Sequence, residues 1–100
     1  MEDLTKHYLI SGRVQGVGYR AFTRRRAEEL KLKGWVRNLK DGRVEAVAQG
    51  SDDGLNAFAK SLWQGASHGQ VDNVSVNEPA TVEDLSNGFE VRKDGSEPCC

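Results

Sequence analysis

The chain has 100 residues, of which 37% are hydrophobic and 29% are charged, and this size and composition fit one small globular domain with a modest core. A formal net charge of -1 and a pI near 6.1 give no overall basic field, which argues against a general nucleic-acid binder. No stretch of about 20 apolar residues could cross a bilayer, and the first residues lack the apolar segment of a secretion signal, so we expect a cytoplasmic chain without membrane contact.

The cysteine pattern excludes a fold stapled by disulfides. Cys99 and Cys100 are the only cysteines, and neighbours in sequence cannot close a loop around a core. The pair is similar to a double-cysteine prenylation tail, but the fourth-from-last cysteine of a C-a-a-X box is absent, so we expect an exposed reduced tail. We predict a single domain over residues 1–100, with its core over about residues 7–92 and a flexible tail over residues 93–100.

The first half of the chain predicts a strand, a helix and a hairpin. Residues 7–13 form a run that is apolar on both faces, as in a central strand. Residues 21–33 carry an apolar stripe opposite a charged one, which is typical of a surface helix, and Gly34 is expected to end it. Residues 35–39 and 43–49 predict two strands joined by a tight Asp-Gly turn.

The second half predicts a helix followed by two strands. Ser51 or Asp52 can cap a helix that Gly65 closes. Its apolar residues recur at helical spacing and are Leu55, Phe58, Ala59, Leu62 and Trp63. Residues 71–78 alternate as a fourth strand, and residues 89–91 predict a short edge strand.

This order of elements predicts an α+β fold, the ferredoxin-like βαββαβ sandwich with two helices on one face of a mostly antiparallel sheet. In that arrangement the first two strands are parallel, and the third lies between them, antiparallel to both. The carboxyl ends of the first two strands then lie at the same edge of the sheet, about 10 Å apart. The loop that ends at Arg20 is therefore expected to meet Asn38.

A glycine loop follows the first strand. Residues 11–20 read Ser-Gly-Arg-Val-Gln-Gly-Val-Gly-Tyr-Arg. Gly16 and Gly18 can adopt positive φ angles, so that backbone amides surround a ligand at the positive end of a helix dipole. Arg20 lies in the first turn of that helix, where the dipole disfavours a cation unless an anion lies nearby. The stretch predicts an anion-binding loop.

Two nucleotide-binding motifs do not fit this loop. Residues 16–21 satisfy G-x-G-x-x-A, a permissive dinucleotide fingerprint, but that fold needs an acidic residue at the end of the second strand, where this chain has Asn38. No Gly-Lys-Ser/Thr triplet follows the glycines, so the P-loop pattern is absent as well. What remains is an anion nest without the nucleotide-binding machinery.

Three stretches together resemble the signature of the acylphosphatases. They are residues 12–20, quoted above, residues 34–38 (Gly-Trp-Val-Arg-Asn) and residues 41–45 (Asp-Gly-Arg-Val-Glu). The resemblance covers about residues 7–92 and implies the ferredoxin-like fold and the hydrolysis of acyl phosphates without metal or cofactor. It also implies that Arg20 holds the phosphate and that Asn38 orients the attacking water. One departure is Ala66 after Gly65, where the family usually has a Gly-Pro pair.

The chemistry of an acyl phosphate fits these residue types. Its leaving group is a carboxylate with a pKa of about 4, which departs without a general acid. Charge on the phosphoryl oxygens can be compensated by the Arg20 guanidinium and by loop amides. The amides are those of Gln15, Gly16, Val17, Gly18, Tyr19 and Arg20. Asn38 can hold a water in line, although it is too weak a base to deprotonate it.

Four other polar residues are expected to have no side-chain role in catalysis. Gln15 is assigned only its backbone amide, and Tyr19 is expected to pack under the loop. His7 and His68 lack neighbours at metal-ligand spacing, so we predict no metal site. The expected partners are an acyl phosphate and inorganic phosphate, the latter as product and competitive inhibitor of a monomer that binds no nucleic acid.

Two other functions fit the same order of elements. An RNA-recognition sheet has it too, but the strand over residues 43–49 has no aromatic residue on which a base could stack. The chain could also be a catalytically idle phosphate-binding domain, since the related domain occurs fused to larger maturation enzymes that use carbamoyl phosphate. Hydrolysis of an acyl phosphate by the isolated chain separates these possibilities.

Overall fold

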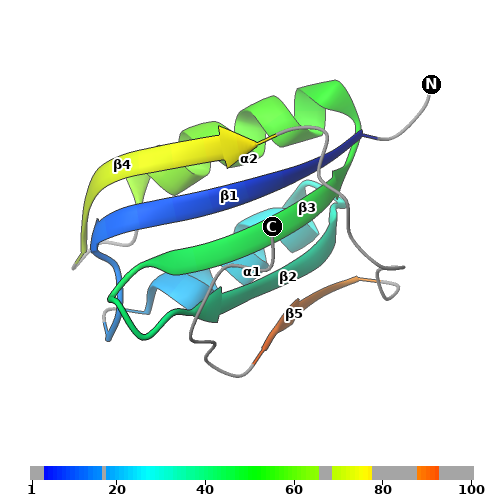
Figure 1. Ribbon diagram of the computed structural model, residues 1–100. Coiled ribbons are helices and arrows are strands. Elements are labelled where there is room, and N and C mark those ends of the chain that lie inside the picture. The colour runs from blue at the N-terminus through cyan, green and yellow to red at the C-terminus, as the bar shows by residue number, and fades with distance from the viewer. Residues whose placement is uncertain (1–3, 17, 66–68, 78–87, 93–100) are drawn as a thin grey trace.

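The computed structural model describes residues 4–16, 18–65, 69–77 and 88–92. In chain order their elements are β1 (Leu4–Arg13), α1 (Tyr19–Glu29), β2 (Lys33–Asn38), β3 (Val44–Gly50), α2 (Asp52–Gln64), β4 (Gln70–Asn77) and β5 (Phe89–Val91). The strands form one sheet in the order β4-β1-β3-β2-β5, and both helices cover the same face of it (Figure 1). The predicted ferredoxin-like α+β fold is confirmed.

The central strand β3 fixes the relation between β1 and β2. It is antiparallel to both, so β1 and β2 run in the same direction, as the sequence predicts. Val44, the first residue of β3, pairs with Ile10 on one side and with Asn38 on the other. The carboxyl ends of β1 and β2 therefore lie at the same edge of the sheet, about two strand spacings or 10 Å apart.

The core lies between the sheet and the two helices. Alternate residues of β1 and β3 point toward the helices because successive side chains of a strand face opposite sides. These include Tyr8 and Ile10 of β1, which have no exposed surface. From α2 the core receives Leu55, Phe58 and Leu62, three of the residues that the helical spacing predicts to face inward. The Tyr8 and Phe58 rings meet edge to face, with centroids 5.3 Å apart.

Helix α1 begins earlier and ends earlier than the sequence predicts. It begins at Tyr19 because Gly18, at φ 78°, is its N-cap, and the Phe22 amide donates to the Gly18 carbonyl at 3.0 Å. It ends at Glu29, since Lys31 has a φ of 59° that reverses the chain. Gly34, expected to end the helix, lies within β2 instead.

Gly34 is needed inside the sheet for reasons of space and of backbone conformation. Its φ is 145°, and a side chain there would collide with the backbone carbonyl oxygen of Val47 in the neighbouring strand. The amide of Gly34 donates to the carbonyl of Gly88 at 3.0 Å. The predicted edge strand over residues 89–91 is confirmed as β5, which runs parallel to β2. Residues 93–100, the predicted tail, lie outside the described residues.

In the described part of the chain, no helix combines the length and the apolar content needed to cross a membrane.

The sheet also holds a buried polar cluster that the sequence analysis did not anticipate. His7 and Glu45 have no exposed surface, and the His7 Nε2 lies 2.7 Å from the Glu45 Oε2. The other carboxylate oxygen of Glu45 accepts a hydrogen bond of 2.6 Å from the Nε of Arg37. His7 is therefore a structural residue that joins β1 to β3, which agrees with its interpretation as an ordinary residue.

We predict that this cluster contributes to stability. Removal of the buried Glu45 carboxylate takes a hydrogen-bond partner from His7 and from the guanidinium of Arg37, whose side chain is only 22% exposed. Glu45→Ala is expected to lower the free energy of unfolding by about 3 kcal/mol, measured by urea unfolding. Glu90→Ala is the matched control, since the ion pair of Glu90 with Arg92 is exposed and its loss should cost less than about 1 kcal/mol. Equal losses in the two variants would contradict the assignment.

Candidate active site

The glycine loop between β1 and α1 presents an uncapped helix start. Gly16 and Gly18 have φ angles of 73° and 78°, in the left-handed region. An added Cβ would meet nothing within 4 Å at either position, so glycine is favoured there by its backbone angle and not by lack of space. Gly18, the N-cap of α1, forms no side-chain capping bond, and the first turn of α1 has no acidic residue. The start of α1 therefore combines backbone amides with the positive end of the helix dipole, which suits an anion. Val17 lies outside the described residues.

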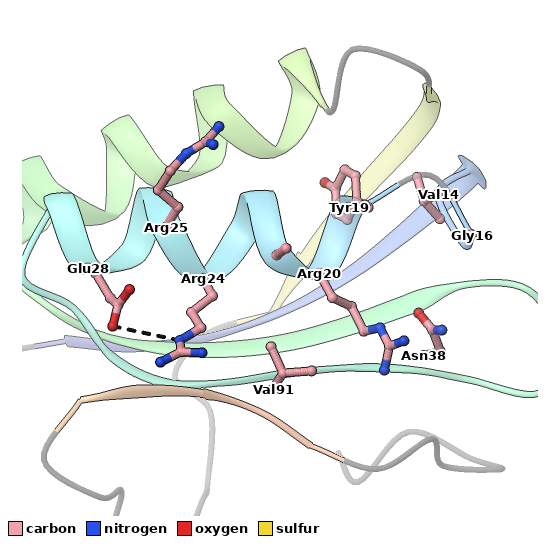
Figure 2. A pocket seen from close by; sticks show the side chains of 11 residues that line it. Val14, Gly16, Tyr19, Arg20, Arg24, Arg25, Glu28, Asn38 and Val91 are labelled. Atoms are coloured by element: carbon pink, nitrogen blue, oxygen red, sulfur yellow. Dashed lines mark ion pairs between the residues drawn. The ribbon is translucent and has the colours of Figure 1, made fainter.

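Arg20 projects from the first turn of α1 toward the end of β2. Its guanidinium and the side chain of Asn38 line the same cavity, and Figure 2 shows both pointing into it. The dipole of α1 places positive potential where Arg20 already carries a positive charge, so the local field favours a bound anion. The sequence predicted that these two residues would meet at one sheet edge, and they do line one cavity.

Asn38 brings a buried acceptor to this cavity. The residue is 8% exposed, and among the described residues its Oδ1 has no hydrogen-bond partner. A buried carbonyl oxygen without a partner costs about 1–3 kcal/mol, which a water or ligand donor would recover. Asn38 is the last residue of β2, so the pairing with Val44 in β3 fixes its backbone.

The cavity is large enough for more than a phosphate group. Its volume is about 480 Å³, against the roughly 30 Å³ that one water molecule occupies in the liquid. It lies where the glycine loop, the first turns of α1, the end of β2 and β5 meet. Besides Arg20 and Asn38, its lining includes Gly16, Gly18, Arg24 and Val91.

Comparison with known proteins decides the family. The model of the acylphosphatase family matches residues 6–91. The chain belongs to the acylphosphatase family. An acylphosphatase of Chloroflexus aurantiacus is 47% identical over 87 residues, which cover 85% of this chain and 95% of that protein. The family predicted from the sequence, and with it the prediction of an acyl phosphate hydrolase, is confirmed.

Solved acylphosphatase structures have the same fold. The structure from Coxiella burnetii has a TM-score of 0.83 at 44% identity and covers 91% of this chain and 94% of that one. The structure from Bacillus subtilis also has a TM-score of 0.83, at 36% identity, and covers 88% of this chain and 97% of that one.

Gln15 ties the two halves of this candidate site together, a role that could not be predicted from the sequence. Its Nε2 donates to the carbonyl of Leu39 at 2.7 Å and to the carbonyl of Arg43 at 2.9 Å. Those two carbonyls also accept the bonds that close the β2–β3 turn, from Gly42 and Leu39. The side chain of Gln15 therefore holds the glycine loop against the turn that follows Asn38. No local sequence pattern signals this contact, because Leu39 and Arg43 follow Gln15 by 24 and 28 residues in the sequence.

Tyr19 anchors the start of α1 to α2. The side chain is 1% exposed, and its hydroxyl donates to the carbonyl of Leu62 in α2 at 2.8 Å. Burial raises the pKa of the Tyr19 phenol well above its ordinary value, so the group stays neutral as a donor. Gly65 ends α2 as predicted, with a φ of 75°, close to the Tyr19 ring. His68 and Ala66 lie outside the described residues.

We predict that the Gln15 bridge is measurable as stability. Gln15→Ala should lower the free energy of unfolding by about 1–2 kcal/mol, since two carbonyls lose a donor. Gln15→Glu should cost more, because a carboxylate only accepts hydrogen bonds and would face two acceptors. Gln70→Glu, at an exposed position of β4, controls for the added charge and should change little. Wild-type stability of Gln15→Glu in urea unfolding would rule out the bridge.

Proposed function

We propose that Arg20 and Asn38 are the catalytic residues with which this acylphosphatase hydrolyses acyl phosphates to a carboxylate and inorganic phosphate. The observation that supports this assignment most is the shared cavity. It combines an uncapped helix start, a guanidinium and a buried amide oxygen without a partner among the described residues. The first two groups suit an anion, and the third suits a water molecule.

The phosphoryl group is held by the glycine loop and Arg20. Backbone amides from Gln15 to Arg20 donate to the phosphoryl oxygens, and the forked guanidinium of Arg20 adds two charge-assisted hydrogen bonds. Phosphoryl transfer spreads charge over the equatorial oxygens, and donors fixed in advance stabilise that charge without reorganisation. These groups supply the charge compensation themselves, so we propose a mechanism without metal or cofactor.

The attacking water is held by Asn38. The Oδ1 of Asn38 accepts a hydrogen bond from the water and directs its lone pair to the phosphorus, opposite the leaving carboxylate. An amide does not take the proton, so the proton passes to a phosphoryl oxygen. The P–O bond to the acyl group breaks, and the carboxylate leaves as a weak base with a pKa of about 4. No general acid is required.

The product phosphate keeps the contacts of the phosphoryl group, so it is a competitive inhibitor. The mechanism needs no group from a second chain, so a monomer is sufficient for it. The absence of a core disulfide framework from the sequence supports the cytoplasm as its location. The RNA-binding alternative has no support from β3, where Glu45 and Val47 occupy positions opposite the helix-facing core.

We predict a division of roles between the two residues. Arg20→Ala should lower the turnover of benzoyl phosphate by about 10²- to 10³-fold, as the loss of a charge-stabilising donor does elsewhere. Arg20→Lys keeps the charge but loses the fork, so it should recover only part of the activity. Asn38→Ala should lower kcat similarly while KM changes little, because the phosphate contacts remain.

The measurement is the initial rate of benzoyl phosphate hydrolysis without added metal, by variants shown to be folded from their far-ultraviolet circular dichroism. Lys60→Gln, at an exposed position on α2, controls for the loss of one positive charge. Wild-type turnover by a folded Arg20→Ala variant would overturn the mechanism.

A further inference from the structure

We propose that Arg24 forms a second anion subsite, which makes acyl phosphates with a negatively charged acyl group the preferred substrates. This inference rests on the proposed function, because it places the acyl group relative to a phosphate held at Arg20. The subsite lies in the same cavity, one helical turn beyond the phosphate. It would bind a carboxylate or another anionic group on the acyl part of the substrate.

The geometry of α1 places the two guanidinium groups in line. Arg24 follows Arg20 by four residues, so the two side chains lie on the same face of the helix, about 6 Å apart along its axis. Both line the cavity. Figure 2 shows both side chains extending from α1 toward the strands below, with Val91 between them.

The space between the two arginines suits the acyl group. Val91 of β5 lines the cavity and is 41% exposed, so it offers an apolar surface to carbon atoms. The cavity of about 480 Å³ lies within the range of roughly 300–1,000 Å³ that is typical of small-molecule sites. A phosphate at Arg20 therefore leaves room for an acyl group that crosses Val91 and reaches Arg24.

The present partner of Arg24 is a weak competitor. Its Nε lies 3.7 Å from the Oε2 of Glu28, and both side chains are 54% exposed. An exposed pair of this kind contributes little to stability, and an Arg placed four residues before a Glu is the less favoured orientation. A substrate anion can therefore replace Glu28 at the guanidinium, or share it.

Arg25 is the neighbouring cation that does not fit this role. It also borders the cavity, but Figure 2 shows its side chain extending toward α2 and away from Arg20. Its guanidinium carbon lies 5.9 Å from the centre of the Phe22 ring, at the outer limit of a cation–π contact. Arg24 is therefore the residue that we assign to the subsite.

The test compares two substrates that differ only in charge. 3-Carboxybenzoyl phosphate carries an anion that the ring keeps away from the phosphate, and 3-carbamoylbenzoyl phosphate is its neutral isostere. The measured quantity is the ratio of their kcat/KM values, which cancels changes that affect both substrates equally. The wild type is expected to prefer the carboxylate, and the preference should fall as salt is added.

Two substitutions should move this ratio in opposite directions. Arg24→Gln is expected to lower it about 3- to 10-fold, because only the charged substrate has a carboxylate that the second guanidinium can bind. Glu28→Gln should raise it, because a competing carboxylate is removed. Arg24→Lys should retain part of the preference, and Lys60→Gln should leave the ratio unchanged.

The outcomes separate the subsite from the catalytic proposal. Hydrolysis of both substrates with an unchanged ratio in Arg24→Gln would overturn the subsite and leave the proposed function intact. A ratio that responds to Arg25→Gln instead of Arg24→Gln would also overturn it. If the folded wild type hydrolyses neither substrate nor benzoyl phosphate, the proposed function fails and the subsite fails with it.

Discussion

The antiparallel pairing of β3 with both β1 and β2 is the constraint on which the site depends. Val44 is paired with Ile10 and with Asn38, so the ends of two strands that lie far apart in sequence are brought to one edge of the sheet. The loop after β1 and the last residue of β2 must then meet. Gln15 fixes their remaining freedom, because one amide group binds two carbonyls of the β2–β3 turn. The pairing of β3 with β1, the pairing of β3 with β2 and the side chain of Gln15 together position the cavity.

The start of α1 lacks the features that usually stabilise a helix terminus and has those that suit an anion. A helix normally gains stability from a side-chain cap and from acidic residues in its first turn. This helix has neither, and it places Arg20 there instead. The dipole, the first amides and the guanidinium therefore contribute potential of the same sign. Local disagreement between sequence and helix preference is expected at functional sites, where a ligand supplies the missing partner.

The sequence predicted what depends on period, glycine placement and chain order. The spacing of Leu55, Phe58 and Leu62 gave α2 its buried face, and the order of elements gave the sheet topology. It misplaced the end of α1, because the φ of 59° at Lys31 has no local signature. It also missed the side-chain contacts of Gln15 and the Glu45 cluster, because their partners lie far away in sequence and are set by strand register.

The loop and Arg20 are proposed to hold phosphate while Asn38 holds water, and a titration with inorganic phosphate monitored by ¹H–¹⁵N NMR tests this division of roles most directly. In the wild type, phosphate should shift the amide signals of the glycine loop and the first turn of α1. Asn38→Ala should bind phosphate with nearly the wild-type Kd, whereas Arg20→Ala should bind at least about tenfold more weakly, since the charge-assisted contact is worth about 1.5 kcal/mol or more. Shifts that cluster elsewhere, or an unchanged Kd in Arg20→Ala, would contradict the claim.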